Sequence, residues 1–160
     1  MFFDATTLAS LAAFLTRFEH PCILCAPMLG RTLAASGRRV TVLDIDERFA
    51  DIPGFRVWNI HRPQRLDERF DIIVCDPPFF KVSLSRLFSA IRVLAQHRFE
   101  QPLLIAYLRR REAALKSTFQ RFGLEATGFL PRYLTVQMVE RNEIELFGNL
   151  GPEAHAALRG

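Results

Sequence analysis

The chain contains the stretch Phe70-Asp71-Ile72-Ile73-Val74-Cys75-Asp76-Pro77-Pro78-Phe79. Its apolar core, residues 72–75, is short and has no polar alternation, which is typical of a strand buried on both faces of a parallel sheet. Two prolines end this run, because proline cannot donate a hydrogen bond to a sheet ladder. The stretch therefore predicts a central parallel strand with an acidic side chain at its carboxyl end.

Similar apolar runs alternate with helical patterns on both sides of this stretch. Apolar residues at helical spacing predict helices over residues 6–19, 29–36, 83–96 and 110–122. Further short apolar runs predict strands over residues 22–26, 40–43, 55–58 and 103–107. Two last strands, residues 125–130 and 144–147, follow one another without a helix between them, which predicts an antiparallel hairpin.

This order predicts an α/β protein with a single Rossmann-like domain. We expect a seven-stranded, mostly parallel sheet that ends in the C-terminal antiparallel hairpin. The domain is expected to span residues 1–150, and residues 151–160 are expected to form a loose C-terminal tail.

Composition sets bounds on the class of protein. The chain has 160 residues, of which 49% are hydrophobic, enough for one core and too many for a disordered chain. No apolar run is long enough to cross a bilayer, and the first residues lack the pattern of a secretory signal. These features predict a cytoplasmic protein without a membrane partner.

Charge and cysteine content say less about the partner. The formal net charge of +4 suits a nucleic-acid substrate, but it also suits an acidic protein partner or a role in solubility alone. Cys22 and Cys25 form a CxxC pair, yet no second pair or histidine pair supplies the other ligands that zinc requires. We therefore predict no metal site, and we interpret Cys22, Cys25 and Cys75 as buried thiols.

In a fold of this kind, ligands bind beyond the carboxyl ends of the strands. The residues found there are Cys25-Ala26-Pro27, Asp44 with Asp46, Asn59, Asp76-Pro77-Pro78-Phe79-Phe80, and Tyr107. Asp44 directly follows its strand and is placed to accept both hydroxyls of a ribose, with a solvated turn or a helix cap as the alternative. Asp46 is a second candidate, with a helix cap as its alternative role.

The Asp76-Pro77-Pro78-Phe79 exit has a chemistry of its own. Prolines hold the chain extended, which leaves backbone carbonyls beside the Asp76 carboxylate and creates a cluster of acceptors only. Such a cluster suits an amine, which brings donors. Phe79 adds a flat face for a planar base or a lysine stem. The alternative is a rigid loop with a core phenylalanine.

At this point the chain resembles a known group. The stretch from Phe70 to Phe79 is similar to motif IV of class I amino-methyltransferases, which carry Asp or Asn-Pro-Pro-aromatic. More narrowly, the chain resembles the probable N6-adenine methyltransferases, a family in which some eukaryotic members act on a lysine of a translation elongation factor. It is also similar to zinc-knuckle adenine methyltransferases of large-subunit ribosomal RNA.

Four other segments carry the narrower resemblance. They are Leu43–Phe49, Phe55–Pro63, Phe129–Arg132 and Asn142-Glu143, so the likeness runs from about Cys22 to Asn149. Most class I methyltransferases have a glycine-rich turn after the first strand, where this chain has Cys25-Ala26-Pro27. The narrower family has Ala-Pro at this place, which favours it over the guanine-methylating enzymes that share the DPPF element.

The resemblance implies S-adenosyl-L-methionine as cofactor. The cofactor-binding residues would be Cys25, Ala26, Pro27, Asp44, Asp46, Asn59 and Asp76. The catalytic residues would be Asp76, Pro77, Pro78 and Phe79, with Phe80, Tyr107 and Arg132 as secondary candidates for substrate contact.

Three functions follow in order of preference. The first is methylation of N6 of adenine in nucleic acid, with RNA ahead of DNA. The second is methylation of a lysine in a translation-related protein. The third is a non-catalytic binding module built on a degenerate methyltransferase fold, which the absence of the glycine-rich turn keeps open.

Overall fold

The computed structural model describes residues 2–134 and 142–160. Its centre is a seven-stranded sheet with the order β3-β2-β1-β4-β5-β7-β6. Strands β1 to β5 run parallel, and β7 pairs antiparallel with both β5 and β6. The predicted α/β fold, with its mostly parallel sheet and final antiparallel pair, is therefore confirmed. The strands are β1 (Pro21–Leu24), β2 (Thr41–Asp44), β3 (Phe55–Val57), β4 (Ile72–Cys75), β5 (Leu103–Leu108), β6 (Glu125–Ala126) and β7 (Ile144–Gly148).

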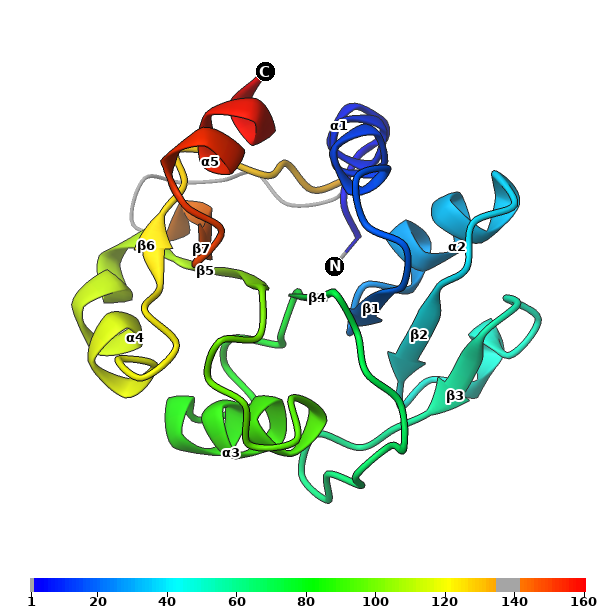
Figure 1. Cartoon of the computed structure of the whole chain (residues 1–160), viewed down its shortest axis with the longest axis horizontal. Coiled ribbons are helices and arrows are strands. Elements are labelled where there is room, and N and C mark those ends of the chain that lie inside the picture. The colour runs from blue at the N-terminus through cyan, green and yellow to red at the C-terminus, as the bar shows by residue number, and fades with distance from the viewer. Residues whose placement is uncertain (1, 135–141) are drawn as a thin grey trace.

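Helices cover both faces of this sheet (Figure 1). Helices α1, α2 and α5 lie on one face, and α3 and α4 lie on the other. The helices are α1 (Ala5–Leu15), α2 (Pro27–Ala35), α3 (Leu84–Leu94), α4 (Glu112–Thr118) and α5 (Pro152–Arg159), with short 3-10 turns η1 (Glu47–Phe49) and η2 (Arg109–Arg111). Coverage of both faces explains why the central strands β1, β4 and β5 are apolar rather than alternating.

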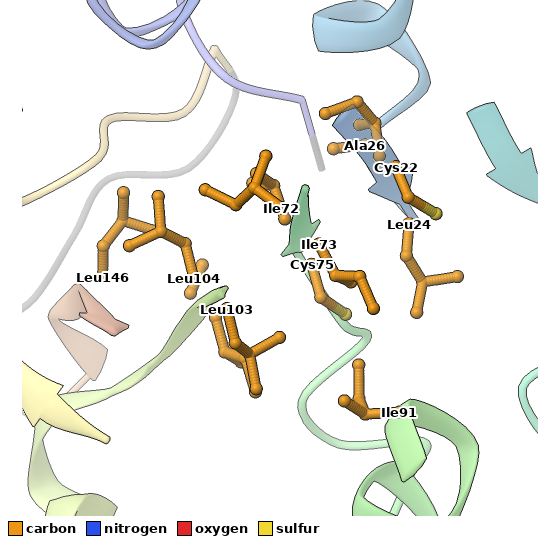
Figure 2. Close-up of a cluster of buried hydrophobic side chains, with 14 of the residues drawn as sticks. Cys22, Leu24, Ala26, Ile72, Ile73, Cys75, Ile91, Leu103, Leu104 and Leu146 are labelled. Atoms are coloured by element: carbon orange, nitrogen blue, oxygen red, sulfur yellow. The ribbon is translucent and has the colours of Figure 1, made fainter. Parts of the chain in front are cut away.

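The core is centred on β1, β4 and β5, all of whose residues are buried. Figure 2 shows their side chains packed together with Ile91 of α3 and Leu146 of β7. Burying one such aliphatic side chain contributes about 1.5–3 kcal/mol to folding. This rigid centre fixes the positions of the loops that leave the carboxyl ends of β1, β2 and β4.

Helix α2 packs unusually close to the sheet. A Cβ atom at Gly30 would overlap the side chain of Val42 on β2, so only glycine fits at this crossing. Gly30 therefore allows close contact between α2 and β2.

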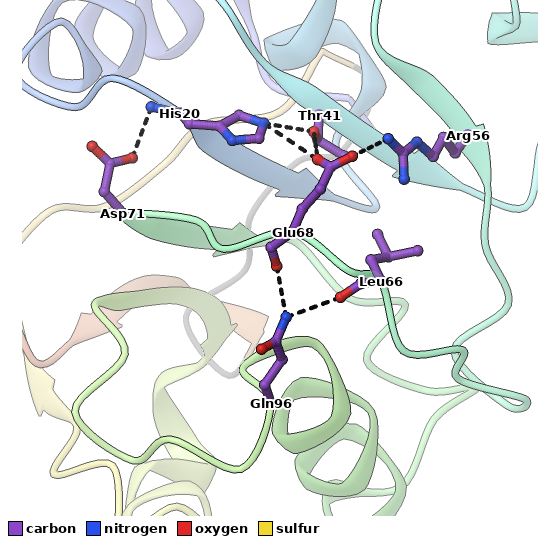
Figure 3. Close-up of polar contacts among 7 residues, drawn as sticks. All are labelled: His20, Thr41, Arg56, Leu66, Glu68, Asp71 and Gln96. Carbon is purple, nitrogen blue, oxygen red and sulfur yellow. Dashed lines mark hydrogen bonds and ion pairs between the residues drawn. The ribbon is translucent and has the colours of Figure 1, made fainter.

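A polar network closes the amino ends of β1, β2 and β4 (Figure 3). His20 Nε2 lies 2.8 Å from Thr41 Oγ1, and the backbone N–H of His20 donates to Asp71 Oδ1 at 2.9 Å. Glu68 pairs with Arg56, and its backbone carbonyl accepts from the Gln96 side chain at 2.9 Å. The polar groups at this end of the sheet thus bond to one another.

The C-terminal segment corrects one expectation. Residues 152–159 form helix α5 rather than a loose tail, with His155 and Leu158 buried. Gly151 has a positive φ of 93°, and Pro152 occupies the first turn of the helix. Arg159 Nη1 donates to the Thr127 carbonyl at 2.7 Å, which ties the helix to the end of β6.

Several elements differ in length from the prediction, among them the helix predicted over 6–19, which ends at Leu15. Strand β6 ends at Ala126, because Gly128 adopts a positive φ of 83° and turns the chain. The helix predicted over 110–122 is divided into η2 and the shorter α4. Among residues 2–134 and 142–160, no helix is long and apolar enough to cross a membrane.

Candidate active site

A cavity of about 430 Å³ opens at the carboxyl ends of β1, β2 and β4. This volume is within the range of small-molecule sites in proteins. Most of the residues predicted for the site come together here. The lining residues are Phe2, Cys25, Pro27, Asp44, Asp46, Phe49, Asp76, Pro77, Pro78, Phe79, Phe80 and Lys81.

Asp76 is the most buried acid in this cavity, with 8% of its surface exposed. Its backbone N–H donates to the Leu24 carbonyl at 3.1 Å, which extends the β1–β4 pairing by one residue. Its carboxyl Oδ1 accepts a hydrogen bond from the Tyr133 hydroxyl at 2.9 Å. Burial raises the pKa of Asp76 to about 7, and the bond from Tyr133 opposes this rise. Near neutral pH the carboxyl is therefore available in both protonation states.

The two prolines present their carbonyls differently. The Pro78 carbonyl accepts from the Lys81 backbone N–H at 2.9 Å and is used by a turn. Within the described part of the chain, no hydrogen bond uses the Pro77 carbonyl. The acceptor row expected from the sequence is thus reduced to the Asp76 carboxyl and the Pro77 carbonyl.

The two phenylalanines after the prolines differ in their exposure to solvent. Phe79 lines the cavity but is only 6% exposed, and its ring meets the Tyr107 ring edge-on at 5.8 Å between centroids. Phe80 is 76% exposed, the largest value among the exposed large hydrophobic residues. Of these two rings, only Phe80 presents a free aromatic face, and Phe79 forms part of the cavity wall.

Asp44 and Asp46 both face the cavity from the end of β2. Asp44 Oδ1 accepts from the Asp46 backbone N–H at 2.8 Å, and partial burial raises the pKa of Asp44. Asp46 caps η1 and pairs with Arg48, whose hydrogen bond lowers the pKa of Asp46. Asp46 therefore caps η1 and also lines the cavity. The Asp44 carboxylate is held by the backbone N–H of Asp46 in the same loop.

The loop after β1 takes a conformation usual for glycine. Cys25 has φ of 62°, in the left-handed region, and its N–H donates to the Leu43 carbonyl at 2.9 Å. Pro27 starts α2, where its missing N–H costs no hydrogen bond. Cys25 and Pro27 contact the cavity, whereas Ala26 between them is buried and does not line it.

Three other predicted residues also lie outside the cavity lining. Asn59 follows Trp58, whose N–H donates to the Asp44 carbonyl at 3.0 Å, but the side-chain oxygen of Asn59 accepts from the His61 N–H at 2.9 Å. Tyr107 is 1% exposed and lies behind Phe79, with its hydroxyl accepting from Arg111. Arg132 is exposed, and its backbone pairs with the N-terminal segment.

Four residues of the site were not found from the sequence. Phe2 and Phe49 form an edge-to-face pair at one wall, with ring centroids 6.0 Å apart. Lys81 follows the motif directly and lines the cavity. Tyr133 reaches Asp76 from 57 residues away and adjoins Arg132, so proximity to that segment was the one available signal.

The cysteines form no recognisable ligand set in the structure. Cys22 is fully buried and burial raises the pKa of its thiol, while Cys25 is half-buried. No group of three or more histidine, cysteine, aspartate or glutamate residues that could hold a metal ion occurs within residues 2–134 and 142–160.

Several solved structures with the same fold are named as methyltransferases or methylases. Magnesium protoporphyrin IX methyltransferase from Synechocystis PCC 6803, with bound SAM, has 16% identity and a TM-score of 0.60, covering 89% of this chain and 78% of that one. A S-adenosylmethionine-dependent methyltransferase from Clostridium acetobutylicum has 9% identity and a TM-score of 0.63, covering 92% of each. Ribosomal protein L11 methylase from Lactobacillus delbrueckii subsp. bulgaricus has 12% identity and a TM-score of 0.55, covering 92% of this chain and 80% of that one.

These identities establish the fold alone, and no curated protein sequence matches the chain. A family model gives the closer assignment. The model described as "Probable N6-adenine methyltransferase" matches residues 1–150, nearly the whole length. The sheet order, the cavity beyond its carboxyl edge and this match agree, and the chain belongs to the probable N6-adenine methyltransferase family of class I methyltransferases.

Proposed function

We propose that this protein transfers a methyl group from S-adenosyl-L-methionine to the N6 amine of an adenine in nucleic acid, with RNA as the first choice. One observation carries this proposal. A buried carboxyl, Asp76, and the Pro77 carbonyl, which bonds to none of the described residues, lie at the same cavity as the ribose candidate Asp44. That arrangement provides acceptors for an amine beside a place for a nucleoside.

The residues present fit S-adenosylmethionine. The cavity of about 430 Å³ suits a ligand of this size, and Asp44 supplies a carboxylate at the strand end where ribose hydroxyls are held in related folds. Phe2 and Phe49 provide aromatic surface for a purine, and the left-handed Cys25 turns the backbone aside as glycine does elsewhere. When bound, the cofactor supplies an activated methyl group on sulfur.

The chain's own residues then act on the substrate amine. Asp76 and the Pro77 carbonyl accept its two hydrogens, which directs the nitrogen lone pair away from both acceptors. A carboxyl whose pKa is about 7 also suits a proton acceptor at neutral pH, and the amine must lose a proton after it gains a methyl group. Phe80 offers an exposed ring on which the base stacks.

A polar hollow beside the motif supports nucleic acid as the substrate. It is lined by Ile60, His61, Pro63, Ser83, Ser85, Arg86 and Ser89. Ser83 follows the motif loop closely, and Lys81 of that loop lines the main cavity. Hydroxyl, guanidinium and ammonium groups are the side chains that bind phosphates. A target inside a duplex must be flipped out before Asp76 can reach it.

Lysine remains the second candidate substrate, with one observation in its favour. The exposed Phe80 ring suits a lysine stem or ammonium as well as a base. One structural neighbour is named a ribosomal protein L11 methylase, so a related fold serves a protein substrate.

Cofactor binding is the first test. Calorimetric titration of the folded protein with S-adenosylmethionine should give a saturable signal at one site per chain, weakened by Asp44→Ala. The absence of any heat with folded protein would exclude methyl transfer and favour the non-catalytic binding module.

Substrate class is the second test. Tritium-labelled cofactor is incubated with cell lysate and either the wild-type protein or Asp76→Ala, and each product is treated with nuclease or protease. We expect label that depends on Asp76, is released by ribonuclease and is recovered as N6-methyladenosine. Label released only by protease would establish a protein substrate instead.

A further inference from the structure

We infer that Tyr133 is a positioning residue for Asp76: its hydroxyl occupies one carboxyl oxygen, holds the side chain in place and leaves the other oxygen for the substrate amine. This inference rests on the proposed function for its catalytic meaning. The contact itself is a property of the unliganded protein and is measurable without the cofactor.

The geometry of this contact is specific. The Tyr133 hydroxyl donates to Asp76 Oδ1 at 2.9 Å, and both residues are buried, at 6% and 8% exposure. A phenol is one donor on a rigid ring, so it fixes the carboxyl with little rotational freedom of its own. The bonded Oδ1 is committed to Tyr133, whereas Asp76 as a whole still lines the cavity.

A paired N-terminal segment holds the phenol in place. Phe3 forms an antiparallel bridge with Tyr133, and the two rings lie 5.2 Å apart. The Asp4 N–H donates to the Arg132 carbonyl at 2.8 Å, and the Leu134 N–H donates to the Phe2 carbonyl at 2.9 Å. Tyr133 is therefore fixed by backbone pairing on both sides rather than by its own hydroxyl alone.

The same N-terminal segment also contributes to the wall of the cavity that Phe2 and Phe49 form. Phe2, two residues before Asp4, lines the cavity wall together with Phe49. One short piece of backbone thus positions both the aromatic wall and the partner of Asp76. We expect changes in Tyr133 to alter the acid more than the wall, because Phe2 is held by main-chain bonds.

The groups around Asp76 show how the Tyr133 hydroxyl affects the pKa of the carboxyl. Burial raises the pKa of Asp76, and the Tyr133 hydrogen bond lowers it because it favours the ionised carboxylate. The charge of the N-terminal amine also lowers this pKa, to a smaller extent than the Tyr133 hydroxyl. Among the described residues, the other ionisable groups that line the cavity or adjoin this carboxyl are Cys25, Asp44, Asp46, Lys81 and Cys75. None of these donates a hydrogen bond to Asp76, so we assign the larger opposing effect to Tyr133.

The decisive experiment compares Tyr133→Phe with the wild-type protein. The titration of the Asp76 carboxyl is followed by carbon NMR in the unliganded protein, with Asp76→Asn used to assign the signal. We expect the midpoint to rise by about one pH unit in Tyr133→Phe, and the acid limb of the rate profile to move by the same amount. The turnover rate at neutral pH should fall about ten-fold, with less change in KM for the cofactor.

A matched control separates positioning from loss of a buried hydroxyl. Thr127 is 1% exposed and donates to the Leu146 carbonyl at 2.6 Å, away from the cavity lining. Thr127→Val should lower stability without moving the Asp76 midpoint or the rate profile.

A second measurement avoids any folding defect in Tyr133→Phe. The chain has two tyrosines, and only Tyr133 bonds Asp76, since the Tyr107 hydroxyl accepts from Arg111. Biosynthetic replacement by 3-fluorotyrosine strengthens the donor, so the Asp76 midpoint should move down.

The outcomes are distinguishable. An unchanged midpoint in both Tyr133→Phe and the fluorinated protein would overturn the inference. A different result is an Asp76 midpoint that shifts in both altered proteins while the wild-type protein transfers no methyl group. That result would contradict the proposed function, and Tyr133 would still be the residue that sets the protonation state of Asp76.

Discussion

The two ends of the sheet use buried polar residues in opposite ways. At the amino ends, the side chains of His20, Thr41 and Glu68 contact one another. At the carboxyl ends, Asp76 and Asp44 each spend one oxygen on the protein and line an open cavity. Buried polar groups that satisfy each other stabilise a fold, whereas acceptors left beside a cavity are available for chemistry.

The strongest way to break this comparison is to remove one acid from each end. Asp76→Ala should lower kcat/KM by about 10³-fold or more, because it removes an acceptor aligned with the reacting amine. Glu68→Ala should cost about 1–2 kcal/mol of unfolding free energy, because Arg56 and Thr41 lose their partner. Methylation assays and chemical denaturation of both variants provide the measurement.

The comparison fails if Glu68→Ala lowers activity as much as Asp76→Ala at a temperature where both are folded. Glu68→Gln serves as the milder control, since it keeps the shape and loses the charge.

The dependence of stability on pH should have opposite signs at the two ends. The pKa of Asp76 is about 7 in the fold against 3.8 unperturbed, so the fold favours the protonated acid. Its contribution is present below about pH 4 and is lost as pH rises to about 7, a loss on the order of 4 kcal/mol that Asp76→Asn should abolish.

His20 should act in the other direction. Burial, followed by the charge of Arg39, lowers its pKa below 6.5, so the fold favours neutral imidazole. Its contribution is present above pH 6.5 and is lost as the solution becomes more acidic. Unfolding curves of wild type, Asp76→Asn and His20→Asn between pH 4 and 8 test both signs. Parallel curves for all three proteins would contradict the assignment.

Within the carboxyl end, Asp44 should differ from Asp76. Asp44→Ala should weaken cofactor binding about 10–100-fold while the turnover rate at saturating cofactor stays within a few-fold of wild type. Calorimetry and saturation kinetics separate the two effects. Equal losses of turnover in Asp44→Ala and Asp76→Ala would mean that the two acids do not have distinct roles.

The smallest effect is expected at Phe80. Because its ring is 76% exposed, Phe80→Ala should leave stability within about 0.5 kcal/mol of wild type. The KM for the nucleic acid should rise about ten-fold through lost stacking, with cofactor affinity unchanged. Phe80→Trp should restore binding, and an unaltered KM in Phe80→Ala would show that the substrate does not reach this ring.

The sequence predicted the parts of this molecule that depend on short-range pattern. Apolar runs predicted the strands because both faces of the sheet are covered, and Asp76-Pro77-Pro78 marked the strand end because prolines stop sheet pairing. The start of α5 carried a readable signal as well. Proline after Gly151 is typical of a helix start, but the helix that follows has only eight residues, too few to show a clear helical period.

The rest depends on contacts between distant segments. The bond from Tyr133 to Asp76 joins residues 57 apart, and Phe2 reaches the cavity only because Phe3 pairs with Tyr133. The sequence also could not predict which way each side chain points. The adjacent residues Phe79 and Phe80 are 6% and 76% exposed. Tyr107 was placed at the right strand end, but its burial behind Phe79 required the packed structure.

The pairing of the N-terminal segment has a practical consequence for protein production. Phe2 lines the cavity and its neighbour Phe3 pairs with Tyr133, so we expect a purification tag attached next to Phe2 to disturb both the cavity wall and the partner of Asp76. An affinity tag placed after the exposed Gly160 avoids both effects, and weak activity in an N-terminally tagged sample should be checked after cleavage.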